Sequence, residues 1–147
     1  MKRIHLLLAD DHAVVREGIR ALLEQHPDMV VVGEAGDRDA ALQAARELRP
    51  NLVLMDAKMP GAGLIDAIRD LKKSVPGAHI LIFTSYAEPA LVRDALGAGA
   101  TGYLLKDALG DDLVRAVREV AAGRAWLHPQ AQRQMLDWIR KPPSPLD

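Results

Sequence analysis

The sequence predicts an α/β protein built on a doubly wound, five-stranded parallel sheet with the strand order 2-1-3-4-5. Short aliphatic runs recur at residues 4–9, 29–35, 52–55, 79–84 and 102–106, and each is typical of a strand. The runs are apolar at almost every position, as expected for strands buried on both faces. Stretches with helical spacing separate them, and this alternation indicates a parallel sheet with helices on both sides.

The helices follow from the spacing of apolar residues between the runs. Four intervals show i, i+3, i+4 or i+7 spacing, at Val15, Ile19, Leu22 and Leu23, at Ile65 and Ile68, at Leu91 and Ala95, and at Leu113, Val117, Val120 and Ala121. The remaining interval, residues 35–50, is rich in alanine, and Pro50 is a stop signal for a helix there. Five strand-helix pairs result.

Composition limits the class of protein. The chain has 147 residues, 49% of them hydrophobic and 27% charged, which fits one globular domain with a short appendage. Its net charge of −1 gives no general attraction to nucleic acid or to anionic membranes. The absence of cysteine excludes disulfides and thiolate metal sites. The N-terminal apolar run meets Asp10 and Asp11 too soon for a signal peptide or membrane span, so we expect a cytoplasmic protein.

Three carboxylates are expected to converge at one edge of the sheet. In this strand order, ligands bind outside the carboxyl ends of strands 1 and 3, where Asp10 with Asp11 and Asp56 stand. Each acid taken alone could instead be a helix N-cap. Together they would repel one another unless a cation lies among them. Oxygen ligands without thiolates or paired histidines favour Mg²⁺, or Mn²⁺ in its place.

Two further strand ends add polar groups to this edge. Thr84 ends the fourth run and Lys106 ends the fifth. Thr84 could be an ordinary β-branched strand residue, and Lys106 could extend into solvent. A carboxylate, a cation, an ammonium and a hydroxyl in one place suit phosphoryl transfer onto Asp56, because that chemistry needs positioning and charge neutralisation.

The motifs "DDH" (10–12), "LMDAKMPG" (54–61), "FTSY" (83–86) and "GYLLKDA" (102–108) occur in order. Over roughly residues 3–123 the chain resembles the receiver domain of a two-component response regulator. The resemblance implies a flavodoxin-like fold and a protein that is not an enzyme in the ordinary sense. The resemblance implies roles for seven residues: Asp56 as phosphoacceptor, Asp10, Asp11 and the Lys58 backbone carbonyl as metal ligands beside it, Thr84 and Lys106 as phosphate contacts, and Tyr103 as the switch aromatic. Tyr103 could also be a plain strand residue with its hydroxyl at the surface.

The stretches "DDHAVVREGIRALL" and "GATGYLLKD" are most similar to the NarL/FixJ (LuxR-type) subfamily. Such proteins usually join the receiver to a C-terminal helix-turn-helix DNA-binding domain. We therefore expect a receiver at 1–125 and, at 126–147, a linker helix with a proline-rich end that leads to a domain missing from this chain. Met135, Trp138 and Ile139 would form the apolar face of that helix; a frayed tail with a buried Trp138 is the alternative.

Two departures from the family pattern concern the loop after the acceptor. After "MPG" the chain has Gly63 where an acid or amide is usual and Leu64 where a glycine is usual, within the loop 61–64. Lys58 lies two residues beyond Asp56, and our hypothesis is that it changes the lifetime of an acyl phosphate there.

The predicted function is a phosphorylation-activated switch that takes phosphate from a sensor histidine kinase and dimerises on activation. It would control transcription through the missing domain. Leu91 and Val92, with Tyr103, are the candidate residues of its output face. Alternatives are an aspartyl phosphohydrolase, which commonly has a second acid where Lys58 stands, and a flavin carrier, whose phosphate Asp10 and Asp11 would repel. A receiver-like module that works without phosphorylation and a stand-alone single-domain regulator also stay open.

Overall fold

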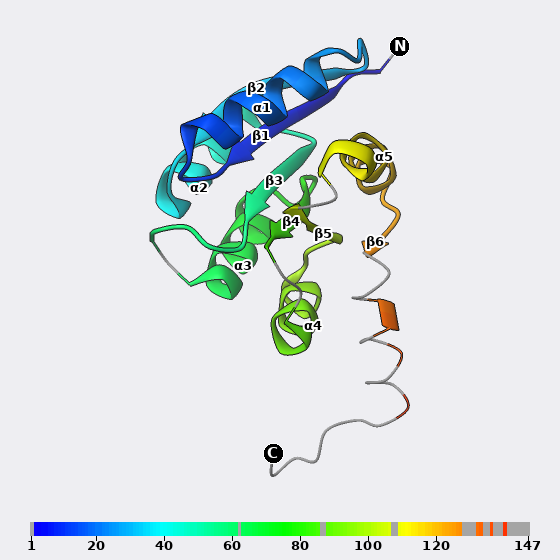
Figure 1. Ribbon diagram of the computed structural model, residues 1–147. Coiled ribbons are helices and arrows are strands. Elements are labelled where there is room, and N and C mark those ends of the chain that lie inside the picture. Colours follow the sequence, from blue (N-terminus) through cyan, green and yellow to red (C-terminus); the bar gives the residue numbers. More distant parts are fainter. Residues whose placement is uncertain are drawn as a thin grey trace.

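The computed structural model describes residues 2–61, 63–85, 88–106 and 109–127, with residues 132, 133, 136 and 140 of the tail. Strands and helices alternate from the N-terminus, as predicted (Figure 1). The elements are β1 (Ile4–Ala9), α1 (Ala13–Glu24), β2 (Met29–Ala35), α2 (Arg38–Leu48), β3 (Leu52–Asp56), α3 (Leu64–Ser74), β4 (His79–Thr84), α4 (Pro89–Ala98), β5 (Gly102–Leu105), α5 (Leu109–Ala121) and β6 (Trp126–Leu127).

The sheet has the order β2-β1-β3-β4-β5-β6, and every neighbouring pair is parallel. The predicted order of the first five strands is therefore confirmed. In the register, Asp56 lies opposite Phe83, and Thr84 lies opposite Leu105. The carboxyl ends of β1, β3, β4 and β5 consequently lie at one edge, where the polar residues were expected.

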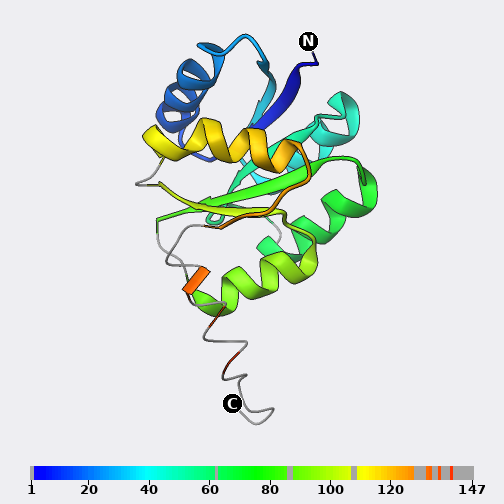
Figure 2. The ribbon, with the colours of Figure 1, turned by 90° about the vertical axis from the view of Figure 1, so that its right-hand side faces the viewer.

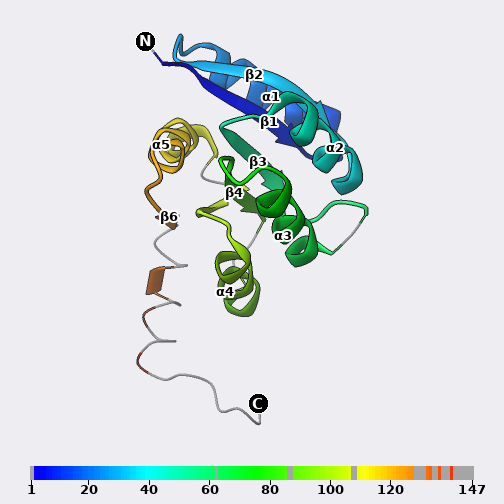
Figure 3. The same cartoon turned by 180° about the vertical axis from the view of Figure 1, so that it is seen from behind.

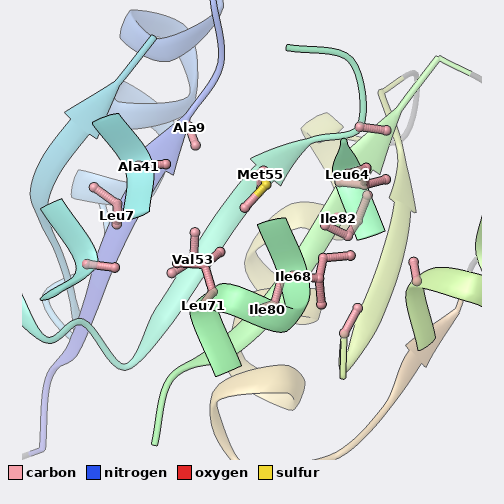
Figure 4. Close-up of a cluster of buried hydrophobic side chains, with 14 of the residues drawn as sticks. Leu7, Ala9, Ala41, Val53, Met55, Leu64, Ile68, Leu71, Ile80 and Ile82 are labelled. Carbon is pink, nitrogen blue, oxygen red and sulfur yellow. The ribbon is translucent and has the colours of Figure 1, made fainter. Parts of the chain in front are cut away.

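Successive residues of each strand enter opposite layers of the core, although both faces are apolar. Leu7, Val53 and Ile80 face the layer under α2, α3 and α4, and Figure 4 shows this cluster. Their neighbours Leu8 and Leu54 face the other layer, with the buried residues of α1 and α5. Figure 2 shows α5 (yellow) beside α1 (blue), with α3 and α4 (green) across the sheet, and Figure 3 shows the α2–α4 side from behind.

The predicted helical stripes pack against the core, although Val15, Leu22, Ile65, Leu91 and Ala121 are only partly buried. Ile19 and Leu23 of α1 are buried, as are Ile68 of α3 and Ala95 of α4. In α5, the residues Leu113, Val117 and Val120 have no exposed surface. The alanine-rich helix α2 ends at Leu48, just before Pro50, with Arg49 in the left-handed conformation at its C-cap (φ 47°).

The short strand β6 was not predicted, because two residues carry no periodic pattern. Its residue Trp126 lies opposite Gly102. A Cβ atom at Gly102 would lie 2.9 Å from the side chains of Leu81 and Val120 and 3.1 Å from the Trp126 carbonyl oxygen. Glycine at this position therefore lets the chain after α5 add a sixth strand to the sheet.

The predicted linker helix depends on Met135, Trp138 and Ile139, which lie outside the described residues. Among the described helices, none is long and apolar enough to cross a bilayer.

Candidate functional site

Three carboxylates meet at the carboxyl edge of the sheet. Asp56 is the last residue of β3, and Asp10 follows β1 directly. Ligand atoms of Asp10, Asp11, His12 and Asp56 all lie within 4.8 Å of one another. Asp10 and Asp56 are buried, with 1% and 2% of their surface exposed, whereas Asp11 is exposed. The structure thus brings together the three acids that the sequence placed at two strand ends.

Asp56 is held by two donors. The backbone N–H of Lys58 donates to its Oδ1 at 3.0 Å, and the Nζ of Lys106 donates to its Oδ2 at 3.0 Å. Burial raises the pKa of Asp56 above its usual value; the Lys58 N–H and Lys106 oppose that effect, and the charge of Asp10 adds to it. The folded protein therefore disfavours the ionised form of Asp56 until more positive charge arrives.

Lys106 follows β5 and reaches back over the site. Its Nζ lies 3.0 Å from Asp56 Oδ2 and 3.7 Å from Asp10 Oδ2. The same Nζ lies 5.2 Å from the centre of the Phe83 ring, and the side chain is 25% exposed. The alternative, a lysine that only extends into solvent, is wrong, because the ammonium contacts both buried acids.

Asp10 is fixed by backbone contacts. Its N–H donates to the Ala35 carbonyl at 3.0 Å, and its Oδ1 accepts from the His12 N–H at 2.7 Å. Arg16 donates to its backbone carbonyl. The N-cap of α1 is His12, so neither Asp10 nor Asp11 caps this helix, and that alternative is wrong for both. The His12 ring contacts Asp11, with its Nδ1 2.8 Å from Oδ1.

These residues fit a hard divalent cation. Asp10 Oδ2 is buried and accepts no hydrogen bond from any described residue. It therefore offers an oxygen ligand beside Asp56, with the exposed Asp11 next to it. Carboxylate oxygens with access to solvent are the ligands that Mg²⁺ prefers, because this ion keeps several waters. The acidic group therefore has the composition of the metal site that the resemblance to receiver domains implies.

The predicted switch residues lie on neighbouring strands. Thr84 ends β4 and is 2% exposed, and Tyr103 of β5 has no exposed surface. The alternative in which the Tyr103 hydroxyl lies at the surface is wrong. Its ring belongs to the core cluster that contains Val92 and Ala95 of α4. Val92 is fully buried too, so it lies beneath the predicted output face, while Leu91 is half-buried.

The Tyr103 hydroxyl is buried and lacks a hydrogen-bond partner within the part of the chain that the structure describes. Burial, with the charges of Glu88 and Asp56, raises the pKa of Tyr103 to about 12. We predict that Tyr103→Phe leaves the free energy of unfolding at pH 7 unchanged or raises it by about 1 kcal/mol, because it removes an unsatisfied polar group.

The same variant tests the pH dependence. The pKa of Tyr103 in the folded protein lies above the ordinary value of 10.0. The contribution of this hydroxyl to the free energy of unfolding is therefore fully present below pH 10, and it is lost as the pH rises toward 12. Urea unfolding between pH 9 and 11 should show a steeper loss of stability in the natural protein than in Tyr103→Phe. Equal slopes would contradict the burial of this hydroxyl in solution.

Arg38, the first residue of α2, is a site residue that sequence reasoning missed. It is 8% exposed, and its Nη2 donates to the Ala57 carbonyl at 2.5 Å. Burial lowers the pKa of Arg38, and the negative charge of Asp56 opposes this. A charged residue at a helix start usually faces solvent, so the sequence carries no signal for this contact.

The loop that departs from the family pattern is compatible with the fold. Gly61 has a positive φ of 113°, which favours glycine. Gly63 is the N-cap of α3, and Leu64 is buried as the first residue of that helix. Ala62 lies outside the described residues. Leucine at position 64 therefore joins the core.

The sequence matches one protein family and several curated relatives. The model of the response regulator receiver domain matches residues 6–118. The chain is 37% identical over 139 residues to the transcriptional regulatory protein LnrK of Bacillus subtilis (strain 168), covering 94% of this chain and 63% of LnrK. It is 39% identical over 137 residues to the DNA-binding transcriptional activator DevR/DosR of Mycobacterium tuberculosis (strain ATCC 25618 / H37Rv), covering 93% of this chain and 63% of DevR/DosR.

Among solved structures, the fold is similar to a two-component response regulator of the LuxR family from Aurantimonas sp. SI85-9A1. The TM-score is 0.88 at 36% identity, and the match covers 95% of this chain and 100% of that chain. The chain spans 63% of the length of each of the two curated relatives above.

Proposed function

The chain belongs to the response regulator receiver domain family, and we propose that it is a signalling switch that accepts a phosphoryl group on Asp56 from a sensor histidine kinase. The observation that carries this proposal is the environment of one carboxylate. Asp56 is buried, lies beside two further acids, and receives Lys106 at 3.0 Å. A receiver of this kind is not a conventional enzyme, since the acceptor is the protein itself.

In the proposed transfer, one oxygen of Asp56 attacks the phosphorus while the bond from phosphorus to the histidine nitrogen of the kinase breaks. The electron pair of that bond leaves with the imidazole. Mg²⁺, or Mn²⁺, held by Asp10, Asp11, Asp56 and the Lys58 carbonyl would supply positive charge to the phosphoryl oxygens. Lys106 is already directed at Asp56 and can follow the transferred group, with Thr84 at the next strand end as the second contact.

The acyl phosphate adds about one unit of negative charge to the site, and such a change can bias two packings of the same fold. Thr84 and Tyr103 would carry the change to the face formed by α4, β5 and α5, where Leu91 lies half-buried. Because the Tyr103 hydroxyl is buried without a hydrogen-bond partner among the described residues, we propose that phosphorylation gives it one and changes the packing of Val92 against the ring.

The process that this switch controls is proposed from the names of its relatives. DevR/DosR is named a DNA-binding transcriptional activator and LnrK a transcriptional regulatory protein. We propose that this receiver likewise controls transcription in the cytoplasm, through a C-terminal helix-turn-helix domain reached from the segment 126–147. Homodimerisation on phosphorylation would bring two such domains together.

The experiment is incubation with Mg²⁺ and a small acyl phosphate donor, followed by intact mass measurement. We expect the natural chain to gain one phosphate and the matched Asp56→Asn variant to gain none. Consumption of the donor without an adduct would instead indicate a phosphohydrolase. An unreacted donor and an unchanged mass would indicate a module that works without phosphorylation.

Lys58 supplies a further prediction about this site. Its side chain is exposed, and its backbone N–H already contacts Asp56. An ammonium over the acyl phosphate would be attracted to it and would screen it from water. We expect Lys58→Ala to dephosphorylate about two to five times faster, the effect of losing an exposed ion pair of about 0.5–1 kcal/mol. Loss of the phosphate adduct followed by mass spectrometry checks this, and equal rates would remove the hypothesis.

A further inference from the structure

We propose that Arg38 is a positioning residue of the phosphorylation site. Its guanidinium holds the start of the segment 57–61 at the Ala57 carbonyl, so that the Lys58 carbonyl is preformed as a ligand for the cation. This inference deepens the proposed function and depends on it for the role of the cation. The geometry of the segment itself depends only on contacts of this chain.

Arg38 binds the segment at two points. Its Nη2 donates to the carbonyl of Ala57, the residue directly after the acceptor, at 2.5 Å. Its backbone N–H donates to the carbonyl of Pro60 at 3.0 Å. Lys58 lies between these two points, and its own N–H is bonded to Asp56. The start of α2 therefore fixes the backbone on both sides of the proposed metal-binding carbonyl.

Packing reinforces the two bonds. A Cβ atom at Gly61 would lie 3.2 Å from the Cβ of Arg38 and 3.3 Å from its backbone nitrogen. With its φ of 113°, Gly61 is a position where a side chain would be strained as well as crowded. The end of the segment thus lies directly against Arg38, which leaves little room for the backbone to move.

Arginine is an unfavourable residue for this position unless its contacts matter. The side chain is buried, and burial of a guanidinium is costly. The positive charge also lies at the N-terminus of α2, where the helix dipole favours negative charge. A residue that breaks two local preferences is expected at a functional site, where its contacts offset the cost. Here the side chain binds the Ala57 carbonyl, directly before Lys58.

The charge of Arg38 and its hydrogen bonds have opposite expected effects on cation binding. A nearby guanidinium repels Mg²⁺, so its removal on electrostatic grounds alone should tighten Mg²⁺ binding. Loss of a hydrogen bond that orients a metal ligand should weaken Mg²⁺ binding, commonly by 10- to 100-fold. The direction of the change in Arg38→Met therefore separates the two roles.

The test compares Arg38→Met with Arg46→Met in the full chain. Arg46 lies on the same helix, is exposed, and donates to the Ser74 hydroxyl at 3.2 Å, so this control removes one charge and one interhelical bond away from the site. Hydrogen exchange of the Lys58 amide is measured without metal, and the Mg²⁺ Kd is measured by calorimetry. We expect about 10-fold faster exchange and about 10-fold weaker Mg²⁺ binding in Arg38→Met, with neither change in Arg46→Met.

An Mg²⁺ Kd in Arg38→Met that is unchanged or lower than in the natural chain would overturn the proposal, as would unchanged exchange of the Lys58 amide. Should Arg38→Met fail to fold, Arg38→Lys is judged by the same two measurements, since it keeps the charge but loses the planar fork. A natural chain that accepts no phosphate would refute the proposed function, while the exchange of the Lys58 amide would still decide whether Arg38 fixes the segment.

Discussion

Asp56→Asn should abolish phosphate acceptance and, in the absence of Mg²⁺, raise the free energy of unfolding at pH 7 by about 1 kcal/mol. The loss of acceptance follows because an amide has no carboxylate oxygen to attack phosphorus. The gain in stability follows because burial raises the pKa of Asp56, which means that the folded state disfavours its charge. An asparagine of similar shape removes that cost.

The sign of the pH dependence follows from the direction of the shift. Since the folded pKa of Asp56 lies above its ordinary value of 3.8, its contribution to stability is complete below that pH and is lost as the pH rises through the folded pKa. The difference between the two proteins should therefore be small near pH 3.5 and grow toward pH 7. Urea unfolding in EDTA across this range measures it.

Mg²⁺ should change which of the two proteins, the natural chain or Asp56→Asn, is more stable. A ligand that binds only the folded state stabilises it, by about 1.4 kcal/mol at ten times its Kd. The natural chain should gain this stabilisation, and Asp56→Asn should gain less because one charged ligand is lost. An Asp56→Asn variant that is less stable than the natural chain in EDTA at pH 7 would contradict the electrostatic account of this site.

Much of the site was predictable because parallel strands place their carboxyl ends at one edge. Asp10, Asp56 and Thr84 each mark such an end, so the strand order alone brought them together. Lys106 was predictable for the same reason, since its long stem starts at the end of β5. The apolar stripes of α1 and α5 likewise identified the buried face of each helix.

Other features depend on contacts that no local pattern encodes. Arg38 faces the Ala57 carbonyl because the first turn of α2 lies against the loop after β3, a tertiary contact. Tyr103 is buried because α4 covers that side of β5, and Val92 is buried by the same packing. The strand β6 forms because Gly102 leaves room for the Trp126 carbonyl. In each case the deciding neighbour is distant in the sequence.

Lys106→Met should be the most destabilising of the single changes predicted at the site. It removes the ammonium that lies 3.0 Å from Asp56 and 3.7 Å from Asp10, two acids that are almost fully buried. Breaking a buried ion pair costs roughly 3–5 kcal/mol, and the 25% exposure of Lys106 reduces our expectation to about 2 kcal/mol at pH 7. Phosphate acceptance should slow by about 100-fold, as when one donor to a transition-state oxyanion is lost.

The loss of stability in Lys106→Met should depend on pH, since it comes from uncompensated carboxylates. Without Lys106 the pKa of Asp56 rises further, because Lys106 is one of the groups that lower it. The variant should therefore approach the natural chain in stability as the pH falls toward about 4, because protonation of Asp56 removes its charge. Lys73→Met on the exposed surface of α3 is the matched control, and it should change little at either pH. A loss in Lys106→Met that is equal at pH 4 and pH 7 would show that packing against Phe83, rather than charge, is the main contribution of this lysine.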